Sequence, residues 1–266
     1  HVDSPRLDLK QHPLYEDSGL VLLDTHYYGG IKKYQWVAQP LALHGVVCKK
    51  DGSLVKVVIG ENDDDPVVGV SDLLIHLAAD QMKKTGSNVV EGEDLNVLFG
   101  SIPAATEEDE KELVKKNILN LLKEKYDIEE DDFISAEIEV VPAGKARDYG
   151  FDRSMVMAYG QDDNVCAYTS LRAIVEEENP ERTSCCILSD KEEVGSQGNT
   201  GMHSSAFENT LAELMDKCGQ YSELNIRRCL RNSMMLSSDV SAAHDPNYPS
   251  VSSPNQNNAE FGKGIV

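Results

Sequence analysis

The chain has 266 residues, 40% of them hydrophobic, and carries 46 acidic against 25 basic side chains, a formal net charge of -21. Because no apolar run approaches the ~20 residues that cross a bilayer, we expect a soluble globular protein of one large or two modest domains. The negative charge argues against nucleic acids and anionic membranes as partners, since both attract basic surfaces.

The cysteines form no C-x-x-C pair, and several lie inside apolar segments, at positions 48, 166, 185, 186, 218 and 229. This pattern predicts reduced core residues in a cytoplasmic protein. The chain starts at His1 inside a patterned segment and stops at Gly264-Ile265-Val266 as if entering another strand. We therefore expect both ends to lie within a longer protein.

The first residues form a His1-Val2-Asp3 pattern. In an extended backbone, His1 and Asp3 point to the same face, so the carboxylate can hold one imidazole nitrogen while the other binds a metal. A terminal histidine without a function is the alternative from these residues alone.

The segment from about residue 38 to 136 differs from its flanks in the pattern of its predicted secondary structure. Two β-rich runs are separated by Lys50-Asp51-Gly52, which indicates a hairpin. Apolar periodicity then predicts a helix over 70–84, with His76 near its apolar side, and a second helix over 106–125 that opens on a capping box at 106–109. Because a strand over 134–142 returns to the earlier part, we interpret 38–136 as an insertion.

Acidic residues recur after the predicted strands of the remaining part. Asp163 follows a strand over 154–159, the Glu192-Glu193 pair follows 185–188, and Asp239 ends 233–238. If these strands are parallel neighbours, their carboxyl ends meet in one crevice. Each acid also has an ordinary explanation: Asp162 and Asp163 are typical of a helix start, and a charged turn is often only a solvated loop.

Several carboxylates and a histidine in one crevice repel each other unless protons or cations neutralise them. Asp, Glu and His with few sulfur ligands suit Zn²⁺, Co²⁺ or Mn²⁺. A paired metal site would use one carboxylate as a bridge and a neighbouring one to handle the proton of a bound water. Glu192 and Glu193 suit this division because consecutive residues aim in different directions.

The order and spacing of four segments carry a resemblance: HVDSPRLDLK, YGQDDNVCAYTSL, DKEEVGSQG and SSDVSAAHDPNY. Together they closely resemble the aspartyl aminopeptidase-like family of cytosolic di-zinc metallopeptidases, from the first residue to the last. The resemblance implies an α/β protein with a three-layer zinc-exopeptidase-like catalytic domain, formed by 1–37 and 137–266. The insertion at 38–136 is similar to the family's β-rich α+β dimerisation domain.

The same resemblance implies roles for individual residues. His1 and Asp239 are similar to ligands of the first zinc, and Glu193 to a ligand of the second. Asp163 resembles the bridging ligand. The remaining roles fall to three residues: Asp3 would orient His1, Glu192 would be the general base, and His76 would enter the active site of the partner subunit.

One departure concerns the second zinc. The family's last ligand is a histidine far downstream, whereas His244 lies in a different family motif, so only Asp163 and Glu193 remain for that ion. The resemblance implies an aminopeptidase that acts on peptides with a free N-terminus, in a dimer-based homo-oligomer, often a tetrahedral dodecamer. A di-zinc carboxypeptidase or deacylase, or a catalytically dead assembly subunit, is the alternative.

Overall fold

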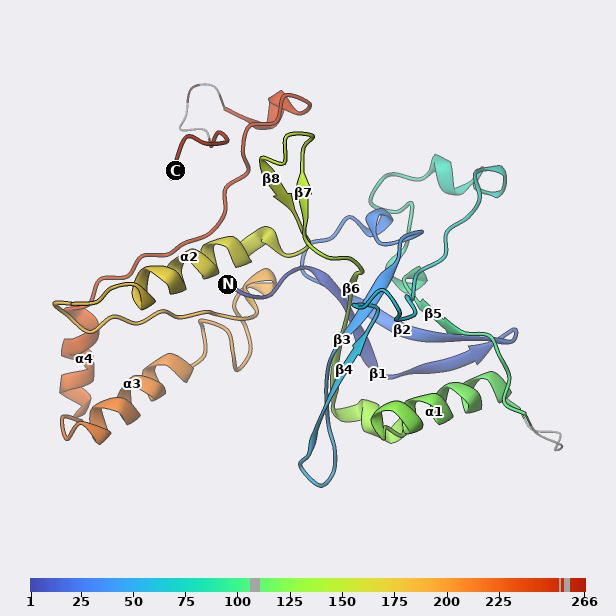
Figure 1. The fold of residues 1–266 in the computed structure, drawn as a ribbon, viewed down its shortest axis with the longest axis horizontal. Coiled ribbons are helices and arrows are strands. Elements are labelled where there is room, and N and C mark those ends of the chain that lie inside the picture. The colour runs from blue at the N-terminus through green and yellow to red at the C-terminus, as the bar shows by residue number, and fades with distance from the viewer. Residues whose placement is uncertain (106–110, 254, 256–258) are drawn as a thin grey trace. The chain divides into compact units, whose positions relative to one another are not determined.

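A computed structural model describes residues 1–105, 111–253, 255 and 259–266 (Figure 1). Its contacts group the chain into two compact units, one formed by Pro5–Tyr159 and the other by His1–Ser4 with Gly160–Val266. The first is called here the sheet unit and the second the helical unit. No helix among the described residues is both long and apolar enough to span a membrane.

The sheet unit is built on a six-stranded antiparallel sheet in the order β4-β3-β6-β1-β2-β5. Its strands are β1 (Arg6–Asp17), β2 (Leu20–Tyr28), β3 (Leu41–Cys48), β4 (Leu54–Ile59), β5 (Val97–Gly100) and β6 (Ala136–Pro142). Figure 1 shows β1 with β2, and β3 with β4, as long hairpins. The predicted hairpin across Lys50-Asp51-Gly52 and the predicted strand over 134–142 are both confirmed.

Burial alternates with period two along β2 and β4, so one face of this sheet packs into the core. Helix α1 (Leu113–Tyr126) covers that core, since its buried residues Val114, Ile118 and Leu122 recur every four positions. The predicted second helix is therefore confirmed over its described part. The capping box predicted at 106–109 lies outside the described residues.

The helix predicted over 70–84 is wrong. The chain there forms only two short 3-10 turns, η2 (Ile75–Leu77) and η3 (Gln81–Lys83). Leu74, Ile75 and Leu77 are each more than 60% exposed. An apolar stripe stabilises a helix mainly by packing against another element, and this stripe is not buried.

The helical unit contains α2 (Gln161–Val175), α3 (Ala206–Lys217) and α4 (Glu223–Arg231). The buried strands predicted over 185–188 and 233–238 are wrong: the structure assigns no strand there, and Ile187, Leu188 and Leu236 are exposed. A buried parallel strand needs neighbouring strands to pair with, and the described part of this unit contains no β-strand.

Two smaller expectations also change. The strand predicted over 154–159 shrinks to β8 (Met155–Met157), which pairs with β7 (Arg147–Tyr149) in the sheet unit and exposes Val156 and Met157. The six cysteines are free, as expected, but each is exposed or half-buried rather than in the core. The exposure of Cys185 and Cys186 has a simple reason: the strand predicted over 185–188 does not form, so their segment is not buried within a sheet.

The division predicted at 37/38 and 136/137, into a catalytic domain and an inserted dimerisation domain, stays a prediction. The boundaries between the two compact units lie elsewhere along the chain, after Ser4 and after Tyr159. The reason is that β1 pairs with β6, so the residues after Ser4 join the same sheet as the predicted insertion.

Gly45 offers a test of the sheet packing. It lies in β3 opposite Ile138, and a Cβ added to it would contact the carbonyl oxygen of Glu137 and come within 2.7 Å of the Ile138 Cα. Backbone cannot yield as a side chain does, so Gly45→Ala should lower the free energy of unfolding by at least ~1–3 kcal/mol, the usual range for overpacking. Denaturant unfolding measures this loss.

Gly86→Ala is the matched control, because a Cβ there meets nothing within 4 Å. It should leave the unfolding midpoint nearly unchanged. Equal midpoints for the Gly45 and Gly86 variants would contradict the strand register.

Candidate metal centre

The N-terminal segment His1–Ser4 runs beside the turn that carries the two adjacent glutamates. The backbone N–H of Val2 donates to the Ser189 carbonyl (2.9 Å). The carboxylate of Asp3, only 4% exposed, accepts the backbone N–H of Glu192 on Oδ1 and that of Glu193 on Oδ2, both at 3.1 Å. Asp3 thereby fixes the 3-10 turn η6 (Glu192–Val194) from which both glutamate side chains project.

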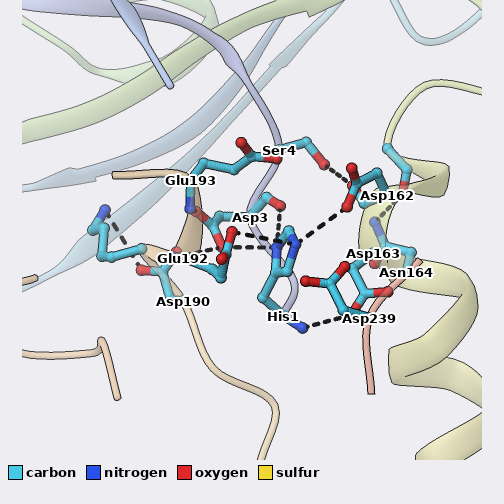
Figure 2. A network of polar contacts seen from close by, with 12 residues as sticks. His1, Asp3, Ser4, Asp162, Asp163, Asn164, Asp190, Glu192, Glu193 and Asp239 are labelled. Carbon is cyan, nitrogen blue, oxygen red and sulfur yellow. Dashed lines mark hydrogen bonds and ion pairs between the residues drawn. The ribbon is translucent and has the colours of Figure 1, made fainter. Parts of the chain in front are cut away.

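The imidazole of His1 lies between two groups of acids (Figure 2). Its Nδ1 lies 2.9 Å from the Asp3 carbonyl oxygen and 3.2 Å from Asp3 Oδ1. Its Nε2 lies 3.3 Å from Asp162 Oδ1 and 3.6 Å from Glu192 Oε2. A proton on Nδ1 satisfies the two Asp3 oxygens and leaves the Nε2 lone pair facing the acids, which is the tautomer that a metal ligand requires.

Two consecutive aspartates at the start of α2 take different directions. The backbone of Asp162 and Asp163 departs from helical dihedral angles, so the regular helix begins after them. Asp162 extends its carboxylate to His1 and remains 59% exposed. Asp163 is fully buried: Oδ2 accepts from the α-amino nitrogen of His1 (2.9 Å), while Oδ1 accepts no hydrogen bond in the described structure.

The ligand atoms gather into two overlapping groups that share His1. One group is His1, Asp162 and Asp239, and the other is His1, Glu192 and Glu193; within each, the ligand atoms lie within 4.8 Å of one another. The carboxylate of Asp239 is held by the N–H of Val240, which donates to Oδ1 (2.7 Å). A neutral imidazole nitrogen with several carboxylate oxygens and no thiolate fits Zn²⁺, Co²⁺ or Mn²⁺.

Electrostatics within the cluster favour a bound cation. Burial, followed by the negative charges of Asp162 and Glu192, raises the pKa of Glu193 to about 7. Burial, followed by the charges of Asp239 and Asp163, also raises the pKa of Asp162. These carboxyls hold protons more tightly than solvated ones do, and a divalent ion would replace those protons at neutral pH.

Five predicted site residues come together in this cluster: His1, Asp3, Glu192, Glu193 and Asp239. Asp163 lies beside it, but Asp162, interpreted from the sequence as an ordinary helix-start residue, provides the acid in the ligand group. His76 lies in the sheet unit on the exposed turn η2, so its predicted role stays a prediction. The sequence indicates that consecutive acids aim in different directions, but it does not indicate which of the two aspartates faces His1, because that depends on the backbone dihedral angles at the start of α2.

Comparison with known proteins identifies relatives along the whole chain. A family model described as aminopeptidase I zinc metalloprotease (M18) matches residues 1–266. A relative from Clostridium acetobutylicum, named as an M18 family aminopeptidase 1, is 65% identical over 266 residues, which are 100% of this chain and 57% of the relative. This chain therefore spans little more than half the length of that protein.

Solved structures show the same fold. An M18 family aminopeptidase from Thermotoga maritima is similar with a TM-score of 0.90 and 44% identity, over 97% of this chain and 57% of that one. The S. cerevisiae mApe1 dodecamer has a TM-score of 0.67 over 97% of this chain and 57% of that chain. At 19% identity, the latter likeness concerns the fold alone.

The raised pKa of Glu193 predicts how stability depends on pH in protein stripped of metal. The unfolded carboxyl ionises near 4.5, whereas the folded one keeps its proton to about pH 7. Between these values the folded state binds more protons, so the Glu193 charge destabilises the fold increasingly as pH rises from about 4.5 to about 7. Thermal unfolding in a chelator across this range measures the effect.

Glu193→Gln serves as the comparison, because it keeps the shape of the side chain and removes the titration. The difference in unfolding temperature between the variant and the unaltered protein should grow in favour of the variant as pH rises. A difference that stays constant from pH 4.5 to 7 would contradict the raised pKa.

Proposed function

Because this chain belongs to the M18 family of aminopeptidase I zinc metalloproteases, we propose that the protein hydrolyses the N-terminal peptide bond of peptides with a free amino group. The observation that carries the proposal is that the two ligand groups both include His1, and that an acid from each group, Asp162 and Glu192, approaches its Nε2. Hydrolysis of an amide by a metal-dependent enzyme needs ion ligands and a separate base, and the cluster provides side chains for both.

We assign two metal positions to the cluster. His1, Asp162 and Asp239 would hold one ion, and Glu193 would belong to the other. Asp162 is the better candidate for a shared ligand than Asp163, because it contacts His1 and is also the acid whose charge most strongly raises the pKa of Glu193. The buried Asp163 would instead stabilise the position of His1, whose α-amino nitrogen donates a hydrogen bond to Asp163 Oδ2.

The chemistry divides between the ions and this chain's own side chains. Zinc held by these residues would supply Lewis-acid chemistry, which favours attack on the scissile carbonyl and makes the attacking water more acidic. Glu192, with a side chain about half exposed, takes a proton from the attacking water and returns it to the leaving amine. Asp3 keeps Glu192 in place by accepting its backbone N–H, and keeps His1 in the tautomer that presents Nε2.

Other reactions use the same metal chemistry with a different pocket. A carboxypeptidase or deacylase would accept peptides with a blocked N-terminus, whereas an aminopeptidase requires the free amine. A panel of matched free-amine and acetylated peptides separates these classes. An assembly subunit without catalytic activity would hydrolyse neither series.

The whole protein is proposed to be a dimer-based, cytoplasmic homo-oligomer with a three-layer catalytic domain. The dodecameric state is described for yeast mApe1, which shares the fold of this chain. His76, flanked by the exposed Leu74, Ile75 and Leu77, is proposed to enter the active site of the partner subunit. The free cysteines support the proposed cytoplasmic location, since oxidising compartments favour disulfides.

The role of Glu192 is tested by Glu192→Gln. The amide keeps the size of the side chain but cannot accept the proton, so zinc content should stay unchanged while kcat falls by a factor of ~10²–10⁴. Metal analysis and steady-state kinetics on a free-amine peptide measure the two quantities. Near-normal turnover would refute the assignment of the base.

The choice between the two aspartates is tested by a matched pair, Asp162→Asn and Asp163→Asn. If Asp162 is the shared ligand, its variant should lose zinc affinity by at least about tenfold, since a neutral amide replaces an anionic ligand. Asp163→Asn should retain more zinc and act mainly on unfolding temperature, because its carboxylate is fully buried. The reverse order of zinc affinities would restore Asp163 as the ligand.

A further inference from the structure

Ser4 is buried at the edge of the acid cluster and contacts the backbone of a proposed metal ligand. It is 8% exposed, and its Oγ donates a hydrogen bond to the carbonyl oxygen of Asp162 (3.0 Å). A Cβ on Gly160 would lie 3.2 Å from this Oγ and 3.1 Å from Asn164 Nδ2. The hydroxyl therefore packs closely against the Gly160 backbone, where a side chain would crowd it.

Asp162 depends on such a contact because the helix does not fix its backbone. Its dihedral angles (φ -83°, ψ 108°) are not helical, and its side chain is 59% exposed, with an ion pair to His1. A hydrogen bond to the carbonyl oxygen restricts rotation of the backbone that carries the carboxylate. Ser4 thus acts on the direction in which Asp162 points.

The contacts of Ser4 complement those of its neighbours in the same short segment. Asp3 holds the turn of Glu192 and Glu193 through their N–H groups, and Ser4 holds Asp162. Successive residues of an extended chain point to opposite sides, so adjacent positions can reach two different elements. One stretch of backbone thereby fixes the spacing between the two ligand groups that share His1.

We propose that Ser4 is a positioning residue for metal binding: its hydroxyl fixes Asp162, as the Asp3 carboxylate fixes Glu192 and Glu193. This inference rests on the proposed function, because it treats Asp162 as a metal ligand. Ser4 touches neither substrate nor ion in this role and acts through Asp162 alone.

The test compares Ser4→Ala and Ser4→Thr with the unaltered protein. Ser4→Ala removes the hydroxyl, and Ser4→Thr keeps it. The readouts are zinc affinity by competition with a chelator, the visible absorption spectrum of the cobalt-substituted protein, and the rise in unfolding temperature on adding zinc. Ser233→Ala is the matched control, since its exposed hydroxyl also donates to a backbone carbonyl of the helical unit, that of Cys229 (2.8 Å).

Ser4→Ala should lower zinc affinity about 10- to 100-fold, the usual effect of removing a group that orients a ligand. It should change the cobalt spectrum and shrink the zinc-induced rise in unfolding temperature, which follows the ratio of metal concentration to dissociation constant. Ser4→Thr should restore affinity to within a few-fold, and Ser233→Ala should match the unaltered protein. In steady-state kinetics at saturating zinc, Ser4→Ala should lower kcat more than it raises KM.

Two results would overturn the inference, and they differ from each other. If Ser4→Ala binds zinc with unchanged affinity and gives an unchanged cobalt spectrum, Ser4 has no positioning role, even if the variant unfolds at a lower temperature. If the unaltered protein binds no metal, the proposed function fails and the inference fails with it. A Ser4→Ala protein that does not fold would leave the Ser4→Thr comparison decisive: a loss of affinity in that variant would contradict a role for the hydroxyl.

Discussion

The helical unit depends on one buried carboxylate, that of Asp3. Each of its oxygens accepts a backbone N–H from the turn that carries Glu192 and Glu193, and Oδ1 also lies 3.2 Å from His1 Nδ1. A buried carboxylate is unfavourable unless charge-assisted hydrogen bonds offset its lost hydration, and Asp3 has such bonds. They connect residues almost two hundred positions apart, so a short N-terminal segment organises a site whose other members come from later in the chain.

The same arrangement creates an electrostatic conflict that a cation would resolve. Asp3 and Ser4 hold the backbone segments that carry these acids, which keeps their carboxylates close to one another. Burial and like charge raise the pKa values of Glu193 and Asp162 as a result. A fold that keeps such groups together at neutral pH gains most from a ligand of opposite charge, because metal binding and folding are then coupled.

The sequence predicted those parts of the fold that are decided locally. The β3–β4 hairpin follows from its turn residues, and α1 follows from a stripe that packs on the adjacent sheet. Periodicity failed where tertiary packing decides, in the segments 70–84, 185–188 and 233–238. Apolar character there indicates that a segment can be buried, but it does not supply the surface that buries it.

The candidate site was more predictable than the fold around it, because the order and spacing of four motifs resemble a known family whose site residues correspond to His1, Asp3, Glu192, Glu193 and Asp239. The expected route to that cluster, parallel strands ending at one edge, is absent from the described residues, and the His1–Ser4 segment brings the acids together instead. The choice between Asp162 and Asp163 was beyond the sequence, since it depends on backbone dihedral angles at the start of α2.

The central claim is that the acids around His1 Nε2 form a metal centre that uses Asp162. A crystal structure of the zinc-loaded protein, with anomalous diffraction recorded at the zinc absorption edge, tests it most directly. We predict an anomalous peak ~2.0–2.2 Å from His1 Nε2 and from carboxylate oxygens of Asp162 and Asp239. A peak bound by Asp163 while Asp162 points to solvent, or no peak at this cluster, would contradict the claim.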